Sequence, residues 1–267
     1  MEIFDAAAIQ RRLNTHQIGR AIEYWPELDS TNTMALRLAA GGAAEGTVVV
    51  ADAQRAGRGR AGTCWYSPPG VNLYLSVLLY PAIEVQKVGL LTLISSLAIA
   101  EAIDAEGGQA QVKWPNDVLL LGRKVAGVLA EVQATAGKVD TLVLGIGVNL
   151  NVSQEMLDGA LGKVAWGAIS LRAALGHRVD RGAFAATLLG RLERRYEQFL
   201  NEGERGIIEA WKTRSFLGQR VAVIAQEGRI EGVAADLDES GALIIRLDDG
   251  STVPVIEGAI RPLRVHE

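Results

Sequence analysis

The chain has 267 residues, of which 49% are hydrophobic, and a formal net charge of −4. This length allows one large domain with a small second one, and gives ample room for a hydrophobic core. The negative charge argues against nucleic-acid binding as the main function, because such proteins usually carry a basic face. The single cysteine excludes an intrachain disulfide, and the three histidines belong to no zinc-binding pattern.

No segment carries a clear targeting or membrane signal. Residues 1–5 lack the basic-then-apolar order of a secretory signal. The most apolar stretch, around residues 90–100, is too short to span a bilayer and contains Thr92, Ser95 and Ser96. The sequence therefore predicts a soluble cytoplasmic protein without a membrane partner.

In chain order, the first predicted elements alternate between helix and strand. Residues 29–32 (DSTN) offer several N-cap side chains to a helix over residues 34–40. A buried strand over residues 47–53 leads into the loop at residues 54–62 (QRAGRGRAG), and a strand over residues 71–80 follows. Alternating apolar residues predict one strongly apolar face for this second strand.

The middle of the chain predicts one long helix followed by several strands. Residues 87–105 read as a mostly buried helix. The strands predicted after it cover residues 111–114, 118–121, 125–132 and 139–150, and the second and third of them form a hairpin. Gly145 and Gly147 interrupt the last strand, which indicates either a closely packed ligand or backbone, or a bulge without a ligand.

The sequence pattern changes after Trp211 from helical to short strands. Before it, residues 151–167 read as irregular, and apolar side chains at every fourth position from Phe184 to Leu200 predict an amphipathic helix. After it, short strands separated by Gly, Asp and Glu predict a small closed β-barrel or sandwich. These strands cover residues 221–225, 229–237, 242–247 and 252–256. We therefore expect one domain over residues 1–214 and a second over residues 215–267.

The loop at residues 54–62 is the most informative segment of the sequence. Its glycines let the backbone approach a ligand closely, and Arg58 and Arg60 carry a permanent charge on a planar fork suited to carboxylates and phosphates. Two arginines among glycines cannot form a core, and ordering such a loop costs backbone entropy. The loop predicts a pocket for an anionic small molecule but does not identify the anion.

Five segments, taken together and in order, resemble the biotin protein ligase family. They are DSTN at 29–32, Gln54 with GRGRAG at 57–62 and Trp65, KWPND at 113–117, RKVAG at 123–127, and GIGVN at 145–149. A looser similarity continues through Trp166 into the C-terminal strands. A lone GRGR would be a weak signal, whereas five ordered segments are a specific one.

The resemblance implies a fold and a reaction. The fold is α+β, with a mixed, largely antiparallel central sheet flanked by helices, as in class II aminoacyl-tRNA synthetases, and a C-terminal SH3-like β-barrel. Such enzymes join the carboxylate of biotin to the α-phosphate of ATP and release pyrophosphate. The biotinyl-5′-AMP then passes its acyl group to a lysine on the biotin carboxyl carrier domain of a carboxylase. The resemblance implies Mg²⁺ with the ATP and no tightly bound prosthetic group.

The resemblance also assigns residues. Lys124, Arg60 and Lys113 would be catalytic, because fixed cations in a water-poor pocket offset the repulsion between two anions. The residues implied for biotin are Ser30, Thr31, Asn32, Gln54, Gly57, Arg58, Arg60, Lys124, Gly127 and Gly145. The residues implied for ATP or the adenylate are Arg58, Arg60, Trp65, Lys113, Asn116, Asp117, Lys124, Asn149 and Trp166. Asp117 would contact the Mg²⁺, which needs few carboxylates because it shares the phosphates.

Plainer interpretations exist for the segments taken singly. Ser30 and Thr31 could simply cap a helix, and residues 114–117 could form a structural turn. Trp65 and Trp166 could be core aromatics. Lys113 and Arg123 could be solvated surface charges, and Cys64 an inert small residue.

The sequence departs from the family pattern at Thr63 and Cys64, where related loops often carry another basic residue. The loop would then close less tightly over the adenylate or take its charge from elsewhere. Some family members are also repressors with an N-terminal winged helix-turn-helix, and the roughly 25 residues before DSTN are too few for that module. We therefore expect no DNA-binding domain and no nucleic-acid partner.

Other functions remain open on the sequence. A non-catalytic sensor of biotin or its adenylate is disfavoured because Lys124 and Arg60 are both present. A repressor is disfavoured by the net charge. A lipoate ligase of related fold is the runner-up enzyme, although its loop is not expected to take this form. The oligomeric state is undetermined, and a homodimer is among the alternatives.

Overall fold

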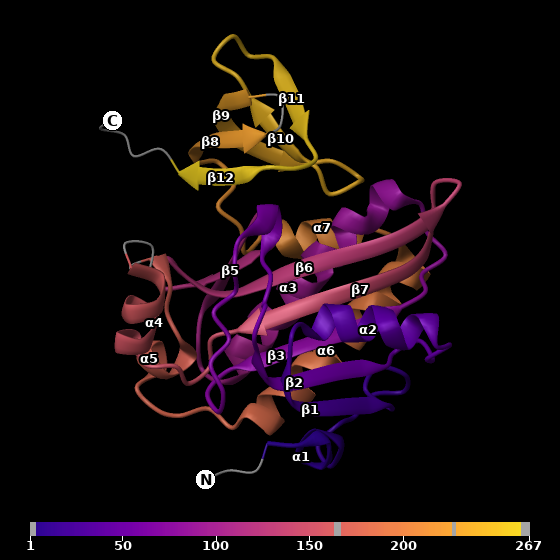
Figure 1. Cartoon of the computed structure of the whole chain (residues 1–267). Coiled ribbons are helices and arrows are strands. Elements are labelled where there is room, and N and C mark those ends of the chain that lie inside the picture. Colours follow the sequence, from indigo (N-terminus) through magenta and orange to yellow (C-terminus); the bar gives the residue numbers. More distant parts are fainter. Residues whose placement is uncertain (1–3, 163–166, 226–227, 263–267) are drawn as a thin grey trace.

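The computed structural model describes residues 4–162, 167–225 and 228–262. The chain forms a large α+β part built around one sheet and a smaller all-β part that lies above it in Figure 1. Helices cover both faces of the large sheet, and helices α4 (Gln154–Leu161) and α5 (Leu171–Leu175) lie beside one end of it (Figure 1). This arrangement confirms the α+β class expected from the sequence.

The large sheet has seven strands in the order β1-β2-β3-β7-β6-β5-β4. Strands β1 and β2 are parallel, and every other neighbouring pair is antiparallel. The strands are β1 (Ile22–Leu28), β2 (Val48–Gln54), β3 (Leu73–Leu79), β4 (Ala110–Lys113), β5 (Asp117–Leu120), β6 (Arg123–Thr135) and β7 (Lys138–Val148). The prediction of a mixed, largely antiparallel sheet is therefore confirmed.

Alternating residues of the central strands enter two different cores. Val48 and Val50 of β2 join the main core with helices α3 and α6, whereas Val49 and Ala51 pack under helix α2. The helices are α1 (Ala6–Gln10), α2 (Thr31–Ala40), α3 (Val88–Ala105), α4 (Gln154–Leu161), α5 (Leu171–Leu175), α6 (Arg181–Glu202) and α7 (Arg205–Lys212). The sheet is thus the middle layer of three, with α2 on one side and α3, α6 and α7 on the other (Figure 1).

Helix α3 is the most apolar segment of the chain. With the preceding short 3₁₀ turn it spans Val85–Ala105, which is long and apolar enough to cross a membrane, and is longer than the stretch expected from sequence. However, 72% of an apolar 18-residue stretch of this segment is buried inside the protein, and the helix packs against α6, α7 and the sheet. Burial in the main core accounts for its composition.

The small part is a five-stranded antiparallel sheet in the order β11-β10-β9-β8-β12. Its strands are β8 (Arg220–Ala225), β9 (Gly228–Leu237), β10 (Leu243–Arg246), β11 (Thr252–Val255) and β12 (Ala259–Pro262). The pairings among the described residues leave β11 and β12 as its two edges, so they do not form a closed barrel. The separate β domain is confirmed, and its closure is not.

Polar contacts between described residues tie this small sheet to the large part. The Lys212 ammonium at the end of α7 lies 2.6 Å from the Asp236 carboxylate on β9. The buried Trp114 indole donates to the Gly241 carbonyl at 3.0 Å. The indole therefore has a structural role, because it links the two parts by a buried hydrogen bond.

Several local predictions were wrong, and tertiary packing explains them. Strand β3 is buried at all seven positions rather than on one face, because α2 covers its second face. Part of the segment expected to be irregular forms α4, which Ser153 caps by accepting from the Met156 amide. Leu200 ends the predicted apolar stripe of α6 but is 52% exposed. Strands β1 and β12 were not predicted at all.

Candidate active site

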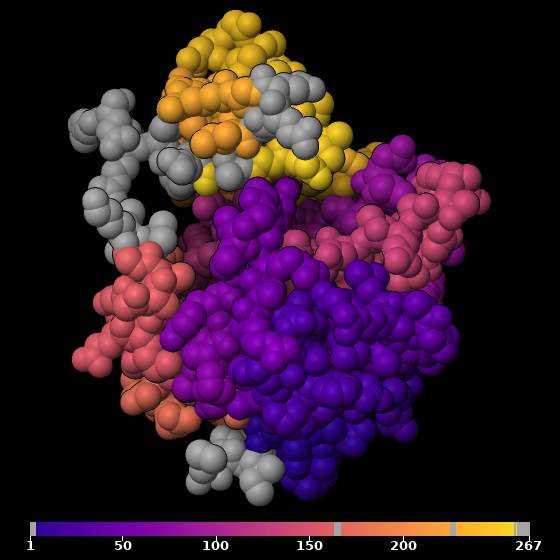
Figure 2. All heavy atoms as spheres, in the orientation of Figure 1, coloured from indigo at the N-terminus to yellow at the C-terminus, as the bar shows by residue number. Residues whose placement is uncertain are grey.

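A cavity of about 1150 Å³ opens where the loop at residues 54–62 (the arginine-glycine loop), the large sheet and the small β domain meet. Its walls come from the start of α2, the loop at 58–66, strands β5 to β7, helix α4 and the C-terminal sheet. The space-filling view shows the loop region, in purple, reaching up to the yellow C-terminal part (Figure 2). The predicted site residues on its wall are Ser30, Thr31, Asn32, Gln54, Arg58, Arg60, Trp65, Lys113, Asn116, Asp117, Lys124, Gly127, Gly145 and Asn149.

Two predicted residues do not belong to that set. Gly57 is not among the lining residues. A Cβ there would lie 2.6 Å from the Trp65 carbonyl oxygen and 2.7 Å from Ser67 Oγ. Gly57 is therefore required for packing of the loop backbone. Trp166 lies outside the described residues, so its expected role on the adenine remains a prediction.

Gln54 and the start of α2 form one end of the cavity. Ser30 occupies the N-cap position and is buried, but its side chain makes no capping hydrogen bond. Gln54 Oε1 accepts from the Thr31 backbone amide at 2.9 Å instead, so a residue from β2 satisfies the first turn of the helix. The other end of the amide, Nε2, donates to Ser67 Oγ at 3.1 Å. Gln54 thus couples the helix to the segment that follows the loop.

Hydrogen bonds hold both ends of the Asn32 side-chain amide. Its Oδ1 accepts from Ser76 Oγ at 2.6 Å, and its Nδ2 donates to the Leu129 carbonyl at 3.2 Å and to Glu131 Oε2 at 2.6 Å. A Cβ on Gly145 would lie 2.1 Å from the same Oδ1. The glycine at position 145 is therefore explained by the Asn32 amide that lies against it, as the sequence allowed when it indicated a closely packed neighbour.

The arginine-glycine loop is a small hairpin. The Trp65 amide donates to the Gly57 carbonyl at 2.9 Å, and the Gly59 amide donates to the Thr63 carbonyl at 2.7 Å. Ala61 and Gly62 at its tip have positive φ angles of 50° and 73°. The positive φ explains the glycine at 62, since L side chains disfavour this region.

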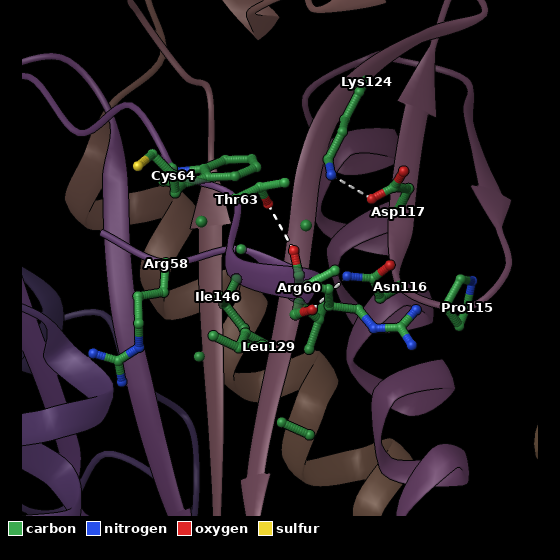
Figure 3. Close-up of a pocket in the computed structure, with 18 of the residues that line it drawn as sticks. Arg58, Arg60, Thr63, Cys64, Pro115, Asn116, Asp117, Lys124, Leu129 and Ile146 are labelled. Atoms are coloured by element: carbon green, nitrogen blue, oxygen red, sulfur yellow. Dashed lines mark hydrogen bonds and ion pairs between the residues drawn. The ribbon is translucent and has the colours of Figure 1, made fainter. Parts of the chain in front are cut away.

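The two loop arginines point in different directions (Figure 3). Arg58 donates to Thr33 Oγ1 at 3.0 Å and to both oxygens of Glu131, at 3.0 and 2.9 Å. Arg60 lies on the side of Asn116 and donates to the Gly258 carbonyl at 3.3 Å, which joins the loop to the small β domain. Only Arg60 of the two lies on the side of the cavity that holds the KWPND segment.

Lys124 lies beside Asp117 and Trp65. Its ammonium is 2.5 Å from Asp117 Oδ1 and 5.4 Å from the centre of the Trp65 ring. A Cβ on Gly147 would lie 2.5 Å from the indole, and one on Gly127 would lie 3.3 Å from it. The indole therefore lies against glycines of β6 and β7 (the glycine floor), and the lysine ammonium lies over the ring.

The indole Nε1 of Trp65 is buried and has no hydrogen-bond partner among the residues that the structure describes. A buried donor without an acceptor costs about 1–3 kcal/mol, so an acceptor from a bound molecule would relieve it. The ring is a cavity wall, and the interpretation of Trp65 as a simple core aromatic does not fit.

Lys113, Asn116 and Asn149 complete the wall near Lys124. Asn116 Nδ2 donates to the Val128 carbonyl at 2.7 Å, which leaves its amide oxygen for other partners. Asn149 is buried and donates to the Ile169 carbonyl at 3.3 Å. Both asparagines are therefore anchored to the backbone, which fixes where their side chains stand.

The described wall of the cavity carries three carboxylates, those of Asp117, Glu131 and Glu257, and Asp117 is the one within the KWPND segment. Among the described residues no group of three or more His, Cys, Asp or Glu side chains could hold a metal. Mg²⁺ commonly takes one or two protein carboxylates and completes its shell with water and substrate phosphates. The residues present fit an ion that arrives with a nucleotide, and Asp117 is the residue expected from the sequence to contact it.

Sequence reasoning missed several residues of the cavity. Glu131 follows Gly127 and Leu129 at alternate positions of β6, and this period of two was the available signal. Ile224, Glu257, Gly258 and Ile260 come from the C-terminal sheet. Nothing in the sequence pattern indicated that these four residues line the cavity, because their position there depends on tertiary structure.

The fold and the cavity define the class of biotin and lipoate ligases. Residues 24–149 match the family model described as "Biotin/lipoate A/B protein ligase family". Residues 216–260 match a second model, "Biotin protein ligase C terminal domain". The first match contains all five sequence segments, and the second contains the cavity residues of the small sheet.

Individual relatives narrow the class. The chain is 35% identical over 240 residues to the "Bifunctional ligase/repressor BirA" of Bacillus subtilis, covering 89% of this chain and 73% of the relative. It is 35% identical over 269 residues to the "Biotin--[acetyl-CoA-carboxylase] ligase" of Mycobacterium tuberculosis, covering 96% of each. Its structure resembles the Aquifex aeolicus biotin protein ligase in complex with biotin and ATP, with a TM-score of 0.77, 28% identity, and 91% and 100% of the chains covered. The chain belongs to the biotin protein ligase family and is a biotin ligase.

Proposed function

We propose that this enzyme joins biotin to a lysine of a biotin carboxyl carrier domain in two steps, with biotinyl-5′-AMP as the intermediate and pyrophosphate as the by-product. The observation that carries the proposal is the cation cluster on one cavity wall. Lys124, Lys113 and Arg60 line the same space, and Lys124 is already paired with a carboxylate at 2.5 Å. A ligand carboxylate or phosphate can take the place that Asp117 holds.

The first step brings two anions together, and their repulsion is the barrier that these residues reduce. Two like unit charges 4 Å apart repel by about 4 kcal/mol at an effective dielectric constant of 20. Lys124 would bridge the biotin carboxylate and the α-phosphate, and Arg60 would hold the new acyl-phosphate. The remaining gain would come from positioning the carboxylate oxygen in line with phosphorus. No side chain needs to form a covalent intermediate.

The biotin head would lie at the end of the cavity formed by Ser30, Thr31 and Gln54. Ser30 is buried, and its hydroxyl makes no capping bond. Gln54 Oε1 is directed at the helix start, so this amide would shape the end of the pocket and keep Ser30 in place. Asn32, Gly57 and Gly145 would act on biotin through the packing described above, and Gly127 through the glycine floor.

The nucleotide would lie on the opposite side, between the KWPND segment and the small β domain. Lys113, Asn116 and Asp117 would face its phosphates, and Asp117 would hold the Mg²⁺ that accompanies them. Asn149 would lie close by, and Trp65 would cover the adenylate with Arg58 behind it. The hydrogen bond from Arg60 to Gly258 supports a role for the small domain in enclosing this side.

Four further points belong to the proposal. The domain boundary lies near residue 214, supported by the second family match that starts at 216. The enzyme acts in the cytoplasm, where its one cysteine, exposed and free, stays reduced. It modifies a carboxylase such as that named for the Mycobacterium tuberculosis relative. It does not repress transcription, given the net charge of −4, and specific DNA binding in a gel-shift assay would contradict this.

The decisive experiment incubates the purified protein with biotin, ATP and Mg²⁺, and then with a carrier domain. We expect pyrophosphate release from ATP and biotin before the carrier domain is added. After the carrier domain is added, we expect biotin on its lysine, detected by intact mass. Lipoate is the matched control substrate, since the first family model covers both acids. Transfer of lipoate in preference to biotin would overturn the substrate, and ligand binding without any turnover would indicate a sensor.

A further inference from the structure

Glu131 is an acidic residue on the wall of a cavity proposed to bind anionic ligands. It lies on β6, and its side chain is 31% exposed. Its carboxylate accepts from Arg58 through both oxygens, at 3.0 and 2.9 Å, and from Asn32 Nδ2 at 2.6 Å. A carboxylate in a site for carboxylates and phosphates repels the ligand unless its charge is compensated. Here Arg58 and Asn32 both donate hydrogen bonds to it.

The contacts of Glu131 connect three separate elements of the chain. Arg58 belongs to the arginine-glycine loop, Asn32 to the first turn of α2, and Glu131 to the sheet. Arg58 also donates to Thr33 Oγ1 on α2, so its guanidinium is held from two sides. Asn32 is fixed in turn by the fully buried Ser76. Glu131 thus ties the loop to a rigid part of the protein.

The two halves of the loop are anchored unequally. Gly57 and Arg58, in the first half, are held by charge-assisted hydrogen bonds to Glu131 and by packing against Trp65 and Ser67. In the second half, Arg60 makes one long bond to the Gly258 carbonyl. Arg58 makes two short contacts to a charged carboxylate, whereas Arg60 makes one 3.3 Å bond to a neutral carbonyl, so the first half has the firmer hold.

We propose that Glu131 is a positioning residue for biotin binding, because it fixes Arg58 and with it the first half of the loop before any ligand arrives. A loop that is already ordered loses less conformational entropy when it closes on biotin. The effect of Glu131 therefore falls on the affinity for biotin. It does not fall on the chemical step, since Arg58 points away from Lys124 (Figure 3). This rests on the proposed function only in naming biotin as the ligand.

The first test measures hydrogen exchange of the peptide at 55–66 in the ligand-free protein. In Glu131→Gln the shape is kept and the charge is lost. We expect the amides of this peptide to exchange up to about 5-fold faster in the variant, the upper end of the range for losing one exposed charged pair. Glu23→Gln, an exposed glutamate on the edge strand β1, is the control and should exchange like the wild type. Unchanged exchange in Glu131→Gln would overturn the proposal whatever the enzyme's substrate.

The second test separates positioning from catalysis. We expect KM for biotin in Glu131→Gln to rise by a similar factor with kcat within about twofold of the wild type. Glu131→Asp should recover part of the loss. Tighter biotin binding in Glu131→Gln would mean that the pair restrains Arg58 from the ligand, and would overturn the proposal. Should Glu131→Gln fold poorly, Arg58→Lys removes the planar fork and must give the same faster exchange.

Discussion

Gly145 is a position where the structure leaves no room for a side chain. A methyl group there would stand 2.1 Å from Asn32 Oδ1. Asn32 cannot retreat without breaking its bonds to Ser76, Leu129 and Glu131. Each such bond contributes about 1 kcal/mol net, so Gly145→Ala should lower the free energy of unfolding by about 2–4 kcal/mol and weaken biotin binding.

Urea unfolding of the ligand-free protein measures this directly. Gly190→Ala in helix α6 is the matched control, because a Cβ there meets nothing within 4 Å. It should stabilise the protein by up to about 1 kcal/mol, the usual gain of alanine over glycine within a helix. In the Asn32→Ala background the extra cost of Gly145→Ala should shrink, because the clashing amide is gone. A loss below about 0.5 kcal/mol for Gly145→Ala alone would refute the reasoning.

Three further outcomes are expected. Lys124→Ala should slow adenylate formation about 100- to 1000-fold in a pyrophosphate-release assay while the circular dichroism spectrum is unchanged, and near-normal turnover would remove it from the central role. Gly147→Ala should displace the Trp65 indole, whose atoms would lie 2.5 Å from the new methyl, and so shift the tryptophan fluorescence and raise KM for ATP. The hydrogen bond from Lys212 lowers the pKa of Asp236. That contact therefore stabilises the folded state above the unfolded pKa of about 3.9 and is lost in acid, so the fall in Tm between pH 6 and pH 3 should be smaller in Asp236→Asn.

Local pattern was enough to place most of the elements. Strand β2, helix α3 and the hairpin of β5 and β6 were predicted within one to three residues at most ends, because their apolar runs are bounded by glycines or charges. Strand β1 was missed because its outer residues are polar or exposed, as expected of an edge strand that carries Pro26. Helix α4 was missed because it is short and buries only Leu157, so it carries no apolar stripe.

The site was predicted as a set of residues but not as a geometry. The five segments converge on one cavity, as expected of the family. The sequence could not show that Arg58 turns to Glu131 while Arg60 turns to Gly258, 198 residues later in the chain. Nor could it show that Trp65 rests on Gly127 and Gly147. Such pairings depend on sheet register and on which strands are neighbours.

The sequence by itself therefore determined the family, the largely antiparallel fold and a group of cations that line the cavity. Those depend on residue types and on their order along the chain, which can be read directly. The tertiary structure decided which of these groups face one another. The neighbouring strands β3, β7 and β6 create the glycine floor and fix Asn32 against Gly145. The pairing of β5 with β6 puts Lys124 beside Asp117. Charges act over a few ångströms, so only the folded chain can say which of them share a ligand.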